Sequence, residues 1–321
     1  MANAVINLTT SAGLSTQQQE YCDKKLLMEY EKRLVYATYA KKIALPLNQG
    51  NTWQGRIYQN LDDVDVALDE GVNPDGLLID QDEVTATVVE WGAFVEATSL
   101  LKKTSFDPIA WTDTMRLLGR NAKDTTDRAY MRVLATAGTV QYAADALQTS
   151  DVATGDLLTI DEIQRAVRTL NLAEAPMYTR SGSPDHYVCI VGPYAVYDLR
   201  NDEDWLKPHE YVDTKNIYSG ELGMHTGVVF VQASNYMVEE DAGAGNPAID
   251  VHSSIVFGEE AYGGVYLGGA QNVRSIINNP GSSGSADPLA MLGTAAWKVD
   301  GFVPVILHDD WMVRIEHAVS A

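Results

Sequence analysis

Two segments in the first third of the chain alternate apolar and polar residues with the period of a β-strand. In Thr52–Tyr58, Trp53 and Ile57 fall on one face and polar residues fall on the other. The segment from Glu83 to about Ala97 continues the alternation after an acidic turn region. Because a two-stranded ribbon is only marginally stable by itself in water, this ribbon must lie on another surface. We predict that this surface belongs to another copy of the same protein.

A helical pattern precedes the ribbon. Ser15 or Thr16 is placed to cap a helix that we expect to run to about Ala40, and Pro46 would end the helical region. The apolar stripe of this helix is wider than one docking face needs, which indicates contacts on more than one side. Its members include Leu26, Leu27, Tyr30, Leu34, Val35 and Ala37.

A longer helix is predicted to start at Asp107-Pro108 and to be closed by Gly138. Asp107 and Pro108 are residue types preferred at the N-cap and N1 positions, and Gly138 suits the C′ position. Apolar residues form one stripe, so we expect a strut that rests on a sheet with one side and is free on the other. The charged side comprises Arg116, Arg120, Lys123, Asp124, Asp127, Arg128 and Arg132.

The second half of the chain mixes short helices and strands. Thr159 and Glu162 have the spacing of a capping box that opens a helix through about Leu172. Pro304 is expected at an edge or bulge of the first closing strand. The other predicted elements are the strands Tyr187–Val191, Gly227–Gln232 and Ser254–Phe257, the helix Tyr194–Arg200, and the closing segments Trp297–Leu307 and Trp311–Val319.

Composition and charge narrow the class of protein. The 321 residues are enough for two or three compact lobes, and a hydrophobic content of 45% is ordinary for a globular protein. The net charge of −21 argues against a surface built to grip nucleic acid or an anionic membrane. The first 42 residues carry six bases and four acids, a net of +2, which leaves −23 for the rest. A basic arm on an acidic body suits docking onto a neighbour, and a solvated helix face explains the same charges equally well.

Motifs that carry chemistry are scarce. An HExxH pattern that begins at His209 has Asp213 in its fifth position, and no phosphate-binding glycine loop is present. The charges from Asp198 to Asp204 allow a catalytic carboxylate pair, but a solvated helix end is the favoured interpretation. The acidic turn region from Leu61 to Gln81 lacks the spacing of a calcium loop. We therefore predict no catalytic, cofactor-binding or metal-ligating residues.

Six stretches of the chain form a further pattern by their order and spacing. They are Leu45-Pro46 followed by Gly50, Thr52 and Arg56, Leu68–Val72 with Pro74, Val84–Val88 leading to Trp91-Gly92, Gly192–Asp202, Gly258–Gly263, and Trp297–Ile315. This pattern resembles the major capsid proteins of tailed bacteriophages, specifically the group named after the N4 coat protein. Asp69 departs from the family, which usually has Thr there.

The resemblance implies an α+β fold of the HK97 type. It would comprise an N-terminal arm over residues 1–44, an extended β-ribbon loop over 45–99, and an axial domain over 157–293. The peripheral domain would contain the long spine helix, over Phe106–Ala137, and cover residues 100–156 and 294–321. The implied function is a structural one, not an enzyme: self-assembly into the icosahedral shell of a virion around a double-stranded DNA genome.

The resemblance also implies partners. They are other copies of the chain in pentamers and hexamers, a separate scaffolding protein, a portal, a cement or decoration protein, and packaged DNA bound without sequence specificity. No membrane is involved, and assembly is expected in the cytoplasm of the bacterial host. The residues expected to contact neighbouring copies are Leu26, Tyr30, Leu34, Trp53, Arg56, Ile57, Glu70, Trp91, Arg116, Arg120 and Arg200.

One property of related shells is expected to be missing here. Some shells of this fold are sealed by a covalent Lys–Asn bond whose lysine lies on the extended loop. Residues 43–101 contain no lysine, so we predict a shell without this crosslink. The alternatives are an encapsulin-like compartment shell, which has the same fold, and an acidic metal-dependent or carbohydrate-active enzyme.

Overall fold

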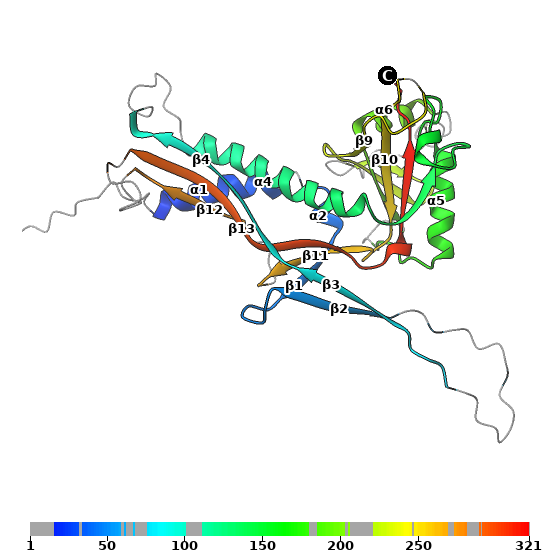
Figure 1. Ribbon diagram of the computed structural model, residues 1–321, viewed down its shortest axis with the longest axis horizontal. Helices are drawn as coiled ribbons and strands as arrows, with labels where there is room; N and C mark the ends of the chain where they lie inside the picture. The colour runs from blue at the N-terminus through cyan, green and yellow to red at the C-terminus, as the bar shows by residue number, and fades with distance from the viewer. Residues whose placement is uncertain are drawn as a thin grey trace, which may run out of the picture.

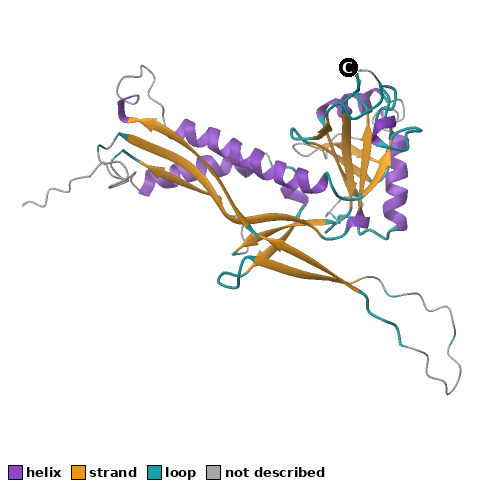
Figure 2. Ribbon diagram, viewed as in Figure 1, coloured by secondary structure: helices purple, strands orange, loops and turns teal. Residues whose placement is uncertain are grey.

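A computed structural model shows an elongated subunit with three parts (Figure 1). A long sheet carries two helices along one face, a compact lobe with a second sheet lies at one end, and a two-stranded ribbon projects away from both (Figure 2). The predicted α+β class is confirmed. The residues that the structure describes are 16–31, 34–58, 61, 67, 76–100, 111–179, 185–202, 205, 221–245, 247–268, 273–280, 289 and 291–320.

The first sheet is organised around one long strand, β13 (Leu292–Ile306). The N-terminal half of β13 lies between β12 and β4, and its C-terminal half pairs with β11, which pairs in parallel with β1. A register shift between Val299 and Phe302 marks the β-bulge where β13 changes partners. The other strands of this sheet are β1 (Lys41–Leu45), β4 (Val89–Thr98), β11 (Tyr262–Leu267) and β12 (Val273–Asn278).

Pro304 lies beyond this bulge. It pairs with Gly264 of β11, whereas the pairing between β13 and β4 ends at Phe302. A proline has no amide hydrogen to donate, so it fits a position where its strand has a single described neighbour. The prediction of an edge or bulge at Pro304 is confirmed.

Two helices cover one face of the first sheet: α1 (Thr16–Glu31) and α4 (Trp111–Leu134). The apolar stripe of α4 packs against β13, where Trp297 is buried and donates a hydrogen bond from Nε1 to Asn121 Oδ1 at 2.9 Å. The prediction that the other side of α4 is free holds only in part: α1 packs against α4, and Lys123 and Asp127 are buried, whereas Arg120, Arg128 and Arg132 remain exposed. Residues 101–110, which include the predicted N-cap of this helix, lie outside the described residues.

The predicted first helix is two helices. The chain leaves α1 at Glu31, forms the short α2 (Tyr36–Tyr39) and enters β1 at Lys41. Tyr262 from β11 donates a hydrogen bond to the backbone oxygen of Tyr36 at 2.8 Å, which holds this turn against the sheet. Tertiary contacts have therefore overridden a continuous helical pattern.

Gly138 has another role than the predicted C′ position. The helix α4 ends at Leu134, and Gly138 has φ 78°. A Cβ at Gly138 would lie 2.8 Å from the backbone oxygen of Met312. Its amide donates to Asp309 Oδ1 at 2.7 Å. Glycine is thus required where the chain passes from α4 into the lobe.

The lobe contains a seven-stranded sheet in the order β5-β14-β10-β6-β8-β7, with β9 paired to β10. The helices α5 (Ile160–Leu172) and α6 (Pro193–Asn201) belong to this lobe (Figure 1). The strands are β5 (Thr139–Tyr142), β6 (Tyr187–Val191), β7 (Glu221–His225), β8 (Val228–Gln232), β9 (Met237–Glu239), β10 (Val251–Phe257) and β14 (Met312–His317). The predicted strand at Tyr187–Val191 is confirmed, and all five of its residues are buried.

The predicted capping box is wrong. Thr159 is the N-cap of α5, but its side chain makes no capping hydrogen bond. Glu162 is buried and accepts hydrogen bonds from Gln141 Nε2 at 2.7 Å and from the amide of Ala144 at 3.1 Å. The carboxylate therefore joins α5 to the edge of the sheet instead of closing its own helix.

Strand pairing crosses the domain limits expected from the sequence. β11 and β12 fall within residues 157–293, yet both pair with β13 in the first sheet. β14 falls within residues 294–321, yet it pairs with β10 and β5 in the lobe. Because each sheet contains strands from distant parts of the chain, no single cut in the sequence separates the first sheet from the lobe.

The ribbon consists of β2 (Thr52–Tyr58) and β3 (Gln81–Thr87), paired from Thr52 opposite Thr87 to Tyr58 opposite Gln81. The first predicted strand is confirmed. The return segment is not one ribbon strand, because its second half is β4 and pairs with β13. In the described part of the chain, no helix is long and apolar enough to cross a membrane.

A buried histidine lies in the core of the lobe. His317 contacts Ser254 Oγ through Nε2 at 3.0 Å and the backbone oxygen of Ala318 through Nδ1 at 2.8 Å. Burial lowers the pKa of His317 from 6.5 to about 4. The folded state thus favours neutral imidazole, and this contribution is complete above pH 6.5 and lost as the pH falls toward 4.

We predict that His317→Gln weakens the acid sensitivity of the subunit. Between pH 7 and pH 4, the free energy of unfolding of the wild type should fall by about 3 kcal/mol more than that of the variant. Urea unfolding of soluble subunits at both pH values measures this difference. Parallel pH profiles for the two proteins would contradict the assignment.

Candidate assembly surfaces

The base of the ribbon is anchored to its own subunit. Ala86 is buried in a small core with Leu45, Val265 and Val305, and Trp53 packs against it. The Trp53 ring lies over Gly55, where an added Cβ would come within 2.1 Å of the ring. The Trp53 ring therefore packs within its own subunit on this side, and this side is not available for the expected contact between copies.

The distal part of the ribbon is apolar and open to solvent. The segment 76–80 precedes β3 and contains Leu77, Leu78 and Ile79, which are 49%, 91% and 69% exposed. Tyr58 on β2 is 62% exposed. Large apolar side chains gathered on an exposed surface indicate a contact with another molecule. The run of three aliphatic residues inside the predicted acidic turn region was the sequence signal for this exposed apolar surface.

A second apolar surface lies on the open face of the first sheet. Phe94 of β4 stands opposite Ala296 of β13, which stands opposite Ile276 of β12. Phe94 is 64% exposed. Trp91 and Ala93, on the covered face of the same strand, pack against the largest hydrophobic cluster, which contains Leu26, Met115 and Trp297 and which we call the main core. The strand alternation therefore presents an apolar row on the side away from the helices.

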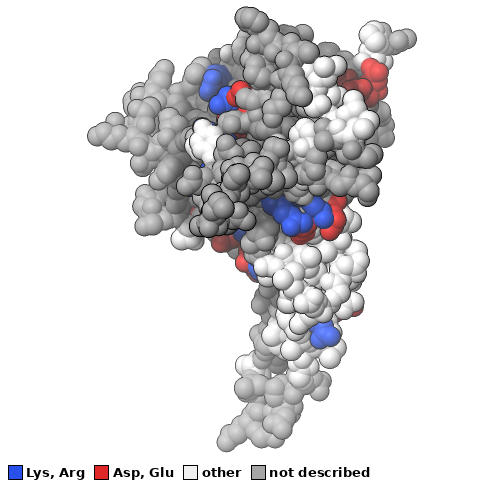
Figure 3. All heavy atoms as spheres, turned by 90° about the vertical axis from the view of Figure 1, so that its left-hand side faces the viewer, with Lys and Arg blue, Asp and Glu red and all other residues white. Residues whose placement is uncertain are grey.

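Charged residues lie beside this apolar row. Lys298 pairs with Glu90 at 2.9 Å and with Asp300 at 3.1 Å, and Arg274 pairs with Asp300 at 3.0 Å. In Figure 3, the described Lys and Arg atoms occur in small groups, several beside acidic atoms, and not as one broad basic patch. This arrangement gives no footprint for nucleic acid on the visible, described surface.

The N-terminal helix is bound within its own subunit. Leu26 and Tyr30 are buried in the main core, and Leu34 packs against it. These residues were expected to contact neighbouring copies, but the structure places them in the fold of a single subunit. Arg116 and Arg120, also expected at contacts, pair with Glu29 of α1 at 4.0 Å and 3.4 Å but stay exposed, so their contact with neighbouring copies remains a prediction.

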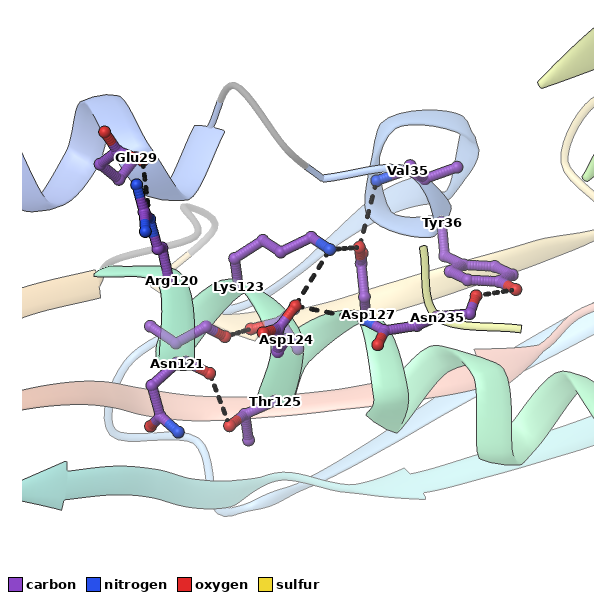
Figure 4. Close-up of polar contacts among 12 residues, drawn as sticks. Glu29, Val35, Tyr36, Arg120, Asn121, Lys123, Asp124, Thr125, Asp127 and Asn235 are labelled. Atoms are coloured by element: carbon purple, nitrogen blue, oxygen red, sulfur yellow. Dashed lines mark hydrogen bonds and ion pairs between the residues drawn. The ribbon is translucent and has the colours of Figure 1, made fainter. Parts of the chain in front are cut away.

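A buried polar cluster joins α4 to the connection between α1 and α2 (Figure 4). Lys123 Nζ lies 3.1 Å from Asp124 Oδ1 and 3.4 Å from Asp127 Oδ2. The amide of Val35 donates to the same Asp127 oxygen at 3.4 Å. Burial raises the pKa of Asp127 from 3.8 to about 6, and Lys123 opposes that rise. Among the described residues, Asp127 Oδ1 has no hydrogen-bond partner, so the cluster is costly to bury and intolerant of losing Lys123.

The other residues expected at contacts are spread over the subunit. Arg56 is exposed on β2, Ile57 is partly buried on the same strand, and Arg200 is exposed at the end of α6. Trp91 faces the core and donates from Nε1 to the backbone oxygen of Phe302 at 3.3 Å. Glu70 lies outside the described residues.

The acidic cluster considered for catalysis has structural partners. Asp198 accepts hydrogen bonds from the amide and the hydroxyl of Ser320. Asp202 accepts from the amide of Ile160 at 3.0 Å at the start of α5. Among the described residues, no three His, Cys, Asp or Glu side chains form a group that could hold a metal ion. Most of the acidic turn region lies outside those residues.

The ribbon and the open face of the first sheet expose apolar side chains, and the carboxylates of Asp198 and Asp202 accept hydrogen bonds within the fold. These features are typical of a structural subunit that contacts other chains. Residues 121–301 match the phage capsid protein family. This match spans more than half of the chain, so the chain belongs to that family. The protein is thus a structural component of a phage virion and not an enzyme. Comparison with curated proteins found no match.

Solved structures share the fold over nearly the whole chain. The capsid of Ralstonia phage GP4 is 15% identical, with a TM-score of 0.72 and coverage of 100% of this chain and 98% of that one. The capsid of cyanophage Pam1 is 14% identical, with a TM-score of 0.62 and coverage of 88% and 92%. An encapsulin complex from Synechococcus elongatus is 10% identical, with a TM-score of 0.52 and coverage of 87% and 85%. The predicted HK97-type fold is confirmed.

We predict that Lys123→Met destabilises the subunit by about 3–5 kcal/mol, because it leaves the Asp127 carboxylate buried without its cation. The double variant Lys123→Met/Asp127→Leu should recover most of this loss. Arg120→Ala is the matched control, because it breaks an exposed pair worth at most about 1 kcal/mol. Denaturant unfolding measures all three, and equal losses for Lys123→Met and Arg120→Ala would contradict the cluster's importance.

Proposed function

We propose that this chain is a major capsid protein of the N4 coat protein group, and that it forms pentamers and hexamers that close into an icosahedral shell. The observation that carries the proposal is the ribbon, whose anchored base and exposed distal apolar run require a partner surface. In a ring of copies, each ribbon would lie across the next subunit. The repeated contact would bury enough area to hold an obligate assembly.

The packaged molecule in this proposal is double-stranded DNA. The net charge of −21 would keep the DNA from adhering to the wall, because like charges repel. On the face that Figure 3 shows, the described Lys and Arg residues form no broad basic patch, which agrees with packaging that does not read the DNA sequence. The family match favours a phage shell over an encapsulin-like compartment.

The partners of assembly follow from the same proposal. A separate scaffolding protein would set the curvature, a portal would occupy one vertex, and a cement or decoration protein would bind the finished surface. The open face of the first sheet, with Phe94 exposed, supports a contact of this kind. Assembly would take place in the cytoplasm of the host.

We predict that shortening the ribbon blocks assembly without unfolding the subunit. Replacing residues 59–80 by Asn-Gly would close β2 and β3 with a two-residue hairpin turn. Soluble subunits with native circular dichroism should form, and negative-stain images should show no closed particles. Wild-type yields of shells from this variant would contradict the proposal.

We also predict that mature particles contain no Lys–Asn crosslink through the ribbon, because residues 43–101 contain no lysine. Denaturing gels of boiled particles should show only the monomer band. Ladders of covalent oligomers would contradict this prediction. A related capsid that does form such crosslinks, run on the same gel, provides the positive control.

A further inference from the structure

One flank of the lobe has features that the proposed function does not use. β5 is the last strand at one edge of the seven-stranded sheet, and α5 lies beside it. A surface pocket of about 310 Å³ lies between them. We call this surface the α5–β5 flank; it comprises the pocket residues Thr139–Tyr142, Leu147, Arg165, Arg168 and Thr169, together with Leu172, which lies one turn beyond Arg168 on α5.

The α5–β5 flank combines exposed aliphatic and cationic side chains. Leu147 and Leu172 are 85% and 80% exposed. Arg165 and Arg168 are three residues apart on α5, so they point to the same side, and both are exposed. Glu162 holds Arg165 at 2.9 Å, which fixes one guanidinium beside the pocket. Such a surface fits a segment with aliphatic side chains and a carboxylate.

The edge of β5 adds a backbone component. Within the described chain, β5 pairs with β14 alone, and β14 lies on one side of it. The backbone groups of a strand point alternately to its two sides, so the outer side of β5 offers donors and acceptors to an extended chain. Proteins commonly recognise a peptide by adding it as a strand to such an edge.

The ribbon carries a segment with the matching chemistry. Leu77, Leu78 and Ile79 are exposed, and Asp80 follows them directly. This segment leads into β3 beyond the last pair with β2, which joins Tyr58 and Gln81. Leu78 is 91% exposed, so no described part of its own subunit covers it, the α5–β5 flank included.

We propose that the α5–β5 flank of one subunit binds residues 77–80 of the ribbon from a second copy. The segment extends the lobe sheet at β5, its aliphatic side chains cover Leu147 and Leu172, and Asp80 pairs with Arg168. This contact rests on the proposed function and identifies where the ribbon lands. It couples the edge of one lobe directly to its neighbour.

Crosslinking tests the contact in assembled particles. Leu78→Cys and Leu147→Cys are combined in one chain with Cys22→Ser, and particles are treated with a short thiol-specific crosslinker. Dimers and higher oligomers of the chain are expected on denaturing gels. The matched control pairs Leu78→Cys with Leu289→Cys, a residue 77% exposed outside the flank, and should stay monomeric.

The outcomes separate this inference from the proposed function. Particles that form normally but give no crosslink from Leu78→Cys/Leu147→Cys would overturn the landing site and leave the shell assignment intact. Oligomers from the control pair alone would overturn it equally. Crosslinking of Leu147→Cys to a different protein would identify another occupant and also overturn it.

A charge exchange gives an independent test. Arg168→Glu should lower the yield of closed particles about tenfold, because it faces Asp80 with a like charge. Arg168→Glu/Asp80→Arg should restore the yield, and Arg128→Glu on exposed α4 surface should leave it unchanged. Full assembly of Arg168→Glu, or no recovery in the double variant although its subunits fold, would overturn the pairing.

Discussion

A two-stranded ribbon is a single layer and cannot bury its apolar side chains by itself. This need for a second layer is the main constraint on the subunit. At its base the ribbon meets this need, because Trp53 and Ala86 pack into a small core with β1 and β11. Farther out, the described residues give no such support, and Leu78 is 91% exposed. In the proposed shell a second chain buries that apolar surface, which would link the stability of the ribbon to assembly.

The rest of the subunit forms a stiff base for that projecting arm. β13 extends through both halves of the first sheet, and α4 is held to it by buried contacts and by the hydrogen bond from Trp297 to Asn121. α1 packs against α4 and also contacts β12. A close-packed core of this kind has low compressibility, so it gives the ribbon a rigid base.

The buried Lys123–Asp127 pair adds a specific constraint to this base. Such a pair contributes little net stability, because desolvation offsets its attraction. Its geometry, however, is satisfied in one arrangement, with the amide of Val35 on the Asp127 carboxylate. The pair therefore fixes where the chain crosses α4 between α1 and α2, and positions the start of β1.

The local patterns of the sequence were sufficient for strand β2, strand β6 and the apolar stripe of α4, because strand alternation and helix periodicity act over a few residues. They did not reveal the break between α1 and α2, the role of Glu162 or the burial of Lys123, since each depends on a residue far away in the chain. The run Leu77–Ile79 was visible in the sequence, but only the tertiary structure shows that the described part of the subunit leaves it exposed. Strand partners were likewise decided by the fold: β4 continues the ribbon strand in sequence and yet pairs with β13, because hydrogen bonds between strands are not encoded in local periodicity.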